Sequence, residues 1–155
     1  MKKIPLSLAL ILLACYATHS MAGHHKKGVL EVEMPYVRAP VPGNSITAAF
    51  LTLINASEQN CQLIAASSSY AKKIEFHTHV YHGDIIKMRS VATVAAASGS
   101  SLAFKPGGLH LMLFGIKHGD MSSVDITINT DKCGDISFTA PIKSIKSMPA
   151  KAMHH

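Results

Sequence analysis

The sequence predicts an all-β fold, a sandwich or barrel built as a single domain. Short segments alternate between apolar and polar residues and are separated by turn-forming residues, and no useful length of chain shows helical periodicity. The alternation is clearest at 124–129 and 136–140. A chain of 155 residues, 48% of them hydrophobic, is long enough to bury one core.

The predicted strands follow from the alternation and from the residues that interrupt it. The first covers 30–36, where apolar residues alternate with two glutamates, and the prolines and glycine of 38–43 end it. The second, near 45–55, is apolar almost throughout, so we expect it to be central and covered on both faces. Further strands are expected at 60–66, 72–81, 85–91, 101–104 and 109–116, for a total of about seven to nine.

Residues 1–22 are expected to be a secretory signal peptide. Two lysines precede an apolar run at 4–17, and the small residues Ser20 and Ala22 occupy the positions that a signal peptidase reads before its cut. The run is too short to span a bilayer comfortably and no second one follows, so we expect no transmembrane segment. We therefore expect a periplasmic protein.

A second processing route is open at Leu12-Leu13-Ala14-Cys15, which resembles a bacterial lipobox. Cleavage there would leave a lipidated Cys15 at the N-terminus. Leucine is a less usual residue just before the small residue of such a motif, so cleavage after Ala22 is the preferred prediction.

The charge of the chain gives little support to nucleic-acid binding. Removal of residues 1–22 leaves 13 basic and 9 acidic residues, a net charge of +4. The basic residues are scattered, without interleaved aromatic residues. No nucleophile comes with a recognisable base, and no paired carboxylates flank the histidines, so we expect a monomeric binding protein and not an enzyme.

Cys61 and Cys133 remain after either processing route. An exported chain favours their pairing in a disulfide. Closing a loop of about 70 residues would stabilise the fold by about 4 kcal/mol in the chain-entropy model. The alternative, two copper thiolates, is disfavoured by an oxidising compartment.

Histidine and methionine gather at 77–88, which reads HTHVYHGDIIKM. Side chains alternate between the faces of a strand, so His77 and His79 should lie together on the outward face. The same rule places His110 and Met112 side by side on the outward face of a later strand. Two strands thus each present a pair of potential metal ligands.

The register of the hairpin decides which residue faces His77. A two-residue loop of His82 and Gly83 would place Met88 directly opposite, with Cβ atoms about 4.5–5.5 Å apart. A loop displaced by one residue would place Ser90 there instead.

Two imidazoles and two thioethers form a soft, neutral donor set: His77, Met88, His110 and Met112. Thioether sulfur binds hard cations and zinc poorly, whereas it suits monovalent copper. The donor types therefore favour Cu(I), with silver as a mimic.

The spacing of these four residues resembles the H-x10-M-x21-H-x-M motif of the PCuAC-type periplasmic copper chaperones. The likeness covers about residues 29–142, and the flanks at 37–40, 47–55, 74–77, 87–89 and 105–113 agree with it. It implies a cupredoxin-like Greek-key β-sandwich that binds one Cu(I) through the four residues. It also implies delivery to the cytochrome oxidase subunit that carries the dinuclear copper centre, with other copper-assembly proteins as further partners.

Further candidate donors lie beside the motif and in the two ends of the chain. His79 stands where many PCuAC-type proteins have a second methionine, and it is a candidate auxiliary ligand. Cleavage after Ala22 would place His25 third from a free amine, an arrangement that wraps Cu(II) in a square-planar set.

The segments 23–28 and 143–155 lack alternation and are expected to be flexible tails. The C-terminal tail carries Met153, His154 and His155, which could collect copper or belong to an end without a role.

Two other functions remain open from the residues alone. Sequestration of copper or silver for metal tolerance would use the same site. A cupredoxin-type redox protein would need a thiolate ligand, but Cys61 and Cys133 lie outside the motif.

Overall fold

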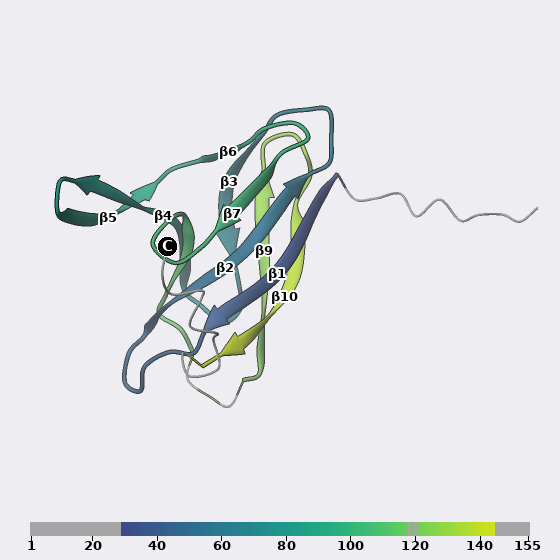
Figure 1. Cartoon of the computed structure of the whole chain (residues 1–155). Helices are drawn as coiled ribbons and strands as arrows, with labels where there is room; N and C mark the ends of the chain where they lie inside the picture. The colour runs from purple at the N-terminus through teal and green to yellow at the C-terminus, as the bar shows by residue number, and fades with distance from the viewer. Residues whose placement is uncertain (1–28, 118, 120, 145–155) are drawn as a thin grey trace, which may run out of the picture.

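The computed structural model describes residues 29–117, 119 and 121–144, and in them ten β-strands form one sheet that folds back on itself as a sandwich (Figure 1). The prediction of an all-β, cupredoxin-like single domain is confirmed. Within these ranges there is no helix capable of crossing a bilayer.

Several predictions made from the sequence fall outside the described residues. They are the signal peptide at 1–22 with Cys15, the N-terminal tail at 23–28 with His25, and residues 145–155 with Met153, His154 and His155.

The strands are β1 (Leu30–Arg38), β2 (Ile46–Asn55), β3 (Cys61–Ser67), β4 (Lys73–His82), β5 (Ile85–Val91), β6 (Val94–Ala96), β7 (Ser101–Phe104), β8 (His110–Phe114), β9 (Ser123–Thr130) and β10 (Ile136–Lys143). The expected total of seven to nine is wrong by one, because β6 was missed. A strand of three residues is too short for alternation to reveal it.

The strand order is β5-β4-β8-β2-β1-β10-β9-β3-β6, with β7 paired to β2. Only the β1–β10 pair is parallel among the pairs of the described residues. A further contact between β3 and β4 brings distant parts of this path together. Strand β2 pairs with three neighbours and is buried at five successive residues, 47–51, so its predicted central position is confirmed.

The core is formed by the inward residues of alternating strands. In β9 Val124, Ile126 and Ile128 are buried while Asp125 between them is exposed, as the alternation predicts. Leu111 and Leu113 of β8 are completely buried. Each such side chain contributes roughly 1.5–3 kcal/mol by leaving water.

Strand β1 departs from the predicted alternation at a β-bulge. The pairing with β2 shifts between Glu33 and Tyr36, and Met34 has a φ of 48° and is 75% exposed. The bulge turns Met34 to solvent and brings Val37 into the core, where it is fully buried.

A buried asparagine at the end of β2 joins the loop between β2 and β3 to the end of β6, near the cysteines. Asn55 Nδ2 donates to the carbonyl oxygens of Gln59 (2.7 Å) and Ala96 (3.0 Å), and Asn55 Oδ1 accepts from the Ser57 amide (3.1 Å). Cys61 and Cys133, 72 positions apart, form a disulfide beside it. Of these three bonds the one to the Ala96 carbonyl is fully buried, so the side-chain amide satisfies a backbone group in the interior.

Asn55→Ala is expected to lower the free energy of unfolding by about 2–4 kcal/mol, because it removes three hydrogen bonds and leaves the buried carbonyl of Ala96 without this donor. Urea denaturation measures the loss. The control is Asn44→Ala, since Asn44 is exposed and accepts one backbone hydrogen bond, from Ile46. Equal losses in the two variants would contradict the role given to Asn55.

Candidate metal centre

Three neighbouring strands carry the four predicted ligands. Strand β4 pairs with β5 on one side and with β8 on the other. Across β4 and β8, His77 lies opposite His110, and Glu75 lies opposite Met112. Residues directly opposite one another project to the same side of a sheet, so the two histidines and Met112 share one face.

Of the two hairpin registers that the sequence leaves open, the structure has the one with Gly83 and Asp84 in the loop. His77 therefore lies opposite Ser90, as that register predicts, and Met88 lies opposite His79, so the direct pairing of His77 with Met88 is wrong. Gly83 has a φ of 57° whereas Asp84 has no positive φ, which is the pattern of a type II′ turn with glycine at its first position. Displacing the loop by one residue moves the pairing by two, so Met88 stays on the same face as the histidines.

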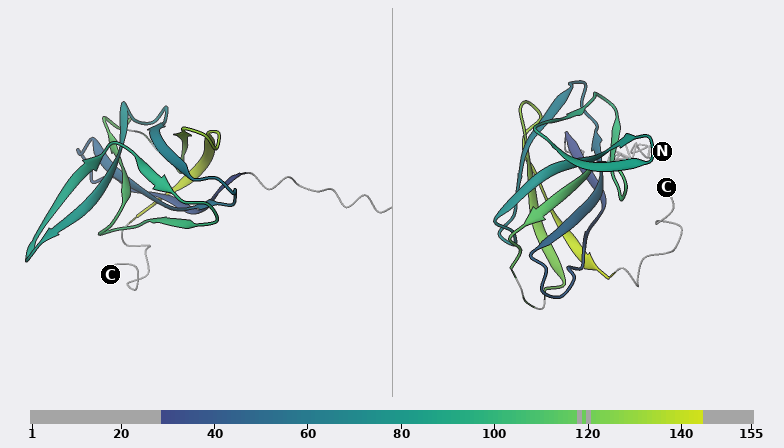
Figure 2. Two further views of the ribbon diagram at one scale, coloured as in Figure 1. Left: turned by 90° about the horizontal axis from the view of Figure 1, so that it is seen from above. Right: turned by 90° about the vertical axis from the view of Figure 1, so that its left-hand side faces the viewer.

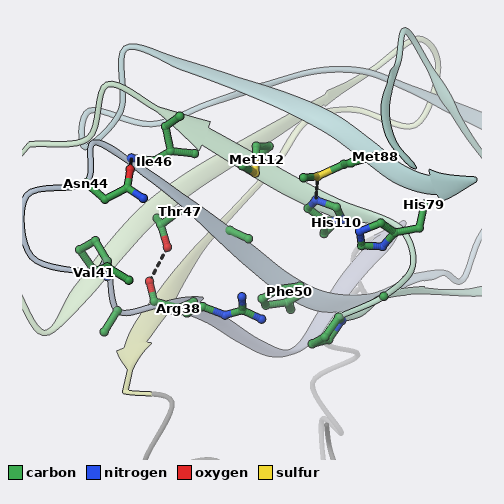
Figure 3. A pocket seen from close by; sticks show the side chains of 15 residues that line it. Arg38, Val41, Asn44, Ile46, Thr47, Phe50, His79, Met88, His110 and Met112 are labelled. Atoms are coloured by element: carbon green, nitrogen blue, oxygen red, sulfur yellow. Dashed lines mark hydrogen bonds between the residues drawn. The ribbon is translucent and has the colours of Figure 1, made fainter. Parts of the chain in front are cut away.

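His110 is held in one orientation by its backbone surroundings. Its Nδ1 donates to the carbonyl oxygen of Gly108 (2.9 Å), so in the neutral ring Nε2 keeps its lone pair. Nε2 lies 3.1 Å from the sulfur of Met88 (Figure 3). The free ring nitrogen of His110 and the thioether sulfur of Met88 thus face each other.

Although the sequence places His110 on an outward face, only 3% of it is exposed. It does occupy the face opposite Leu111 and Leu113, as predicted. That face is covered, however, by the Phe50 ring at 6.2 Å and by the rings of His77 and His79 at 5.9 and 5.5 Å. Met88 is 43% exposed and forms the open side.

His77 is oriented by a carboxylate on its own strand. Its Nε2 donates to Glu75 Oε2 (2.8 Å), while Glu75 Oε1 binds the Lys73 ammonium (2.8 Å). The hydrogen bonds from Lys73 first, and then from His77, hold the pKa of Glu75 below its ordinary value. Nδ1 of His77 is buried and has no hydrogen-bond partner in the described part of the chain.

A cavity of about 340 Å³ adjoins these side chains (Figure 3). Its donor-bearing wall consists of His79, Met88, His110 and Met112. Arg38, Asn44, Ile46, Thr47 and Phe50 contribute to the rest. His77 does not line it.

A family model described as "Putative lipoprotein LpqE-like" matches residues 30–142. The chain belongs to this LpqE-like family. "Putative lipoprotein Lxx21020" of Leifsonia xyli subsp. xyli is 30% identical to it over 102 residues, which are 65% of this chain. The LpqE-like chain spans about 60% of the length of that relative.

Solved PCuAC domains share the fold of this LpqE-like protein. The copper-bound PCuAC domain from PmoF2 is 20% identical with a TM-score of 0.64, and the match covers 76% of this chain and 94% of that one. The Cu(I) form of DR1885 from Deinococcus radiodurans is 27% identical with a TM-score of 0.61, covering 79% and 83%. The predicted resemblance to PCuAC-type proteins is confirmed at the level of fold.

The observed spacing suits one shared ion. With metal–nitrogen bonds of about 2.0–2.1 Å, two imidazoles on the same ion have ring centroids roughly 4.5–6.3 Å apart. The ring of His110 lies within this range of both His77 and His79. In the described residues no three His, Cys, Asp or Glu side chains form a metal cluster by themselves, so an ion here depends on methionine sulfur.

The sequence interpretation missed two contributors to the site. Glu75 fixes the ring of His77, and its signal was its position two residues earlier on the same face of a strand. The hydrogen bond to the Gly108 carbonyl could not be predicted, because residue types do not reveal where a backbone carbonyl points.

The pKa of His110 is predicted to lie below the ordinary 6.5, chiefly because burial disfavours the charged ring. The hydrogen bond to Gly108 opposes this shift, and the charges of His79, His77 and Arg38 add to it. His110 is therefore neutral and able to bind a metal at pH 7. Imidazole NMR titration measures this pKa.

The same shift makes the metal-free protein sensitive to acid. Between the lowered pKa and 6.5 the unfolded chain binds more protons than the native one, so the free energy of unfolding falls as pH falls through this window. In His110→Gln the free energy of unfolding, measured by urea denaturation, should depend less steeply on pH than in wild type. A titration midpoint at or above 6.5 would contradict the assignment.

Proposed function

We propose that this LpqE-like protein is an exported copper chaperone that binds one Cu(I) through His77, Met88, His110 and Met112. The main support is the orientation of His110, whose free Nε2 faces the Met88 sulfur at 3.1 Å. Two solved structures with this fold add support, since one is a copper-bound PCuAC domain and the other is the Cu(I) form of DR1885.

The donors favour Cu(I) over other ions. Two thioethers and two neutral imidazoles bring no negative charge, which suits a soft monovalent ion and leaves Mg²⁺, Ca²⁺ and Zn²⁺ poorly bound. A neutral site can also give its copper up to a thiolate acceptor. We propose accordingly that the protein is a carrier and not an enzyme, and that it acts as a monomer.

The β4–β5 hairpin is a candidate docking element for the acceptor. It projects beyond the body of the sandwich (Figure 2). Tyr81, Ile85, Ile86 and Met88 are between 43% and 60% exposed there. Exposed apolar side chains beside a metal ligand suit transient contact with a second protein.

We propose the oxidase subunit with the dinuclear copper centre as the acceptor, on the resemblance to PCuAC-type chaperones. Other copper-assembly proteins are further candidates. Transfer there requires a periplasmic location, which a signal peptide at 1–22 would provide. The word lipoprotein in the names of the family and of the Leifsonia protein gives weight to anchoring at Cys15 as the other route.

Sequestration for metal tolerance is the principal alternative, and the exposed hairpin favours delivery over it. Loss of oxidase activity under copper scarcity in a deletion strain would indicate delivery, whereas sensitivity to excess copper would indicate storage. A cupredoxin-type redox role is less well supported, because Cys61 and Cys133 are bonded to each other and offer no thiolate.

Met112→Leu and His110→Ala are each expected to weaken Cu(I) binding by at least about tenfold, or about 1.4 kcal/mol. Competition with a chromophoric Cu(I) chelator under reducing, oxygen-free conditions measures the change. Met121→Leu is the matched control, since Met121 is exposed and does not line the cavity. Equal affinities in Met112→Leu and wild type would contradict the proposed ligand set.

Ile85→Asp and Ile86→Asp are expected to slow Cu(I) transfer to the acceptor domain at least about fivefold, because a charge in the contact opposes docking. Their Cu(I) affinity should stay unchanged. Stopped-flow transfer kinetics measure the rate.

Val29→Asp serves as the control for these variants. Val29 is 45% exposed and immediately precedes β1, whose first residues lie on the other side of the molecule from the hairpin (Figure 1). Transfer at the wild-type rate in both hairpin variants would exclude the hairpin as the docking element.

A further inference from the structure

We propose that His79 is an additional copper donor, and that its imidazole enables this site to hold Cu(II) as well as Cu(I). The inference rests on the proposed copper site. It assigns a separate role to His79, which the four-residue ligand set leaves out.

The first argument is position. Met88 lies directly opposite His79 and not opposite His77. The His79 ring is 5.5 Å from the His110 ring, against 5.9 Å for His77. His79 lines the cavity together with Met88, His110 and Met112, whereas His77 does not. Figure 3 shows the rings of His79 and His110 beside the Met88 sulfur.

The second argument is the state of the ring nitrogens. Nδ1 of His79 is buried and has no hydrogen-bond partner in the part of the chain that the structure describes. A buried polar atom without a partner is costly, and a bound ion would satisfy it. His77, in contrast, already uses Nε2 to bind Glu75 and has only Nδ1 to offer.

The third argument is the preference of each oxidation state. Cu(I) accepts few ligands and binds thioethers well, so Met88 and Met112 with His110 and His77 suffice for it. Cu(II) prefers imidazole nitrogen in tetragonal geometry. His79 and His110 supply two such nitrogens beside the cavity, with 5.5 Å between their ring centroids. The two donor sets overlap, so the ion can stay on the site in either state.

The test is Cu(II) binding to the full chain in a background with His24, His25, His154 and His155 replaced by alanine, which removes terminal imidazoles. Pulsed EPR counts the coordinated imidazoles, and titration gives the affinity. The background protein should show two imidazoles. His79→Ala and His79→Met should each show one, with Cu(II) affinity reduced at least about tenfold and Cu(I) affinity changed less than about threefold.

His82→Ala is the matched control, because His82 ends β4 on the opposite face from His79 and does not line the cavity. It should leave both affinities unchanged. Two coordinated imidazoles in both His79 variants, or unchanged Cu(II) affinity, would overturn the role of His79 while Cu(I) binding stands. Failure of the background protein to bind Cu(I) would instead overturn the proposed function.

Discussion

The hydrogen-bonded pairing of β4 with both β5 and β8 is the constraint on which the candidate copper site depends. Its donors come from three strands, and no strand carries more than two of the four. Their mutual positions are therefore set by register, which places His77 opposite His110 and brings Met88 onto the same face. Leu111 and Leu113 hold this register, because a slip of one residue would bring them out of the core.

The site has one fixed side and one open side. His110 is buried and held by Gly108, and His77 is held by Glu75, so both imidazoles are oriented before any ion arrives. Met88 stands on the projecting hairpin and is 43% exposed. In the proposed function, copper would lie between a rigid imidazole side and an exposed thioether, and an acceptor could approach it from the hairpin for ligand exchange.

The sequence predicted the fold class and the strands well, because a strand buried on one face has apolar residues at alternate positions, as at Val124, Ile126 and Ile128. It failed where backbone geometry decides, at the three-residue β6 and at the bulge that exposes Met34, and it left open the hairpin register that pairs Met88 with His79. Burial of His110 was also missed, because its cover comes from Phe50 on β2, distant in sequence. The motif gave the identities of the candidate ligands, whereas the contacts that orient them required the structure.

X-ray absorption at the copper edge of the Cu(I)-loaded protein tests the central claim most directly, since it identifies the atoms that touch the ion. A mixed shell of imidazole nitrogen and two sulfur atoms is expected, with one sulfur lost in Met88→Leu. Because Met88 lies on β5, a sulfur lost in this variant cannot be assigned to the methionines near the C-terminus. A shell of nitrogen and oxygen alone, or one unchanged in Met88→Leu, would contradict the account.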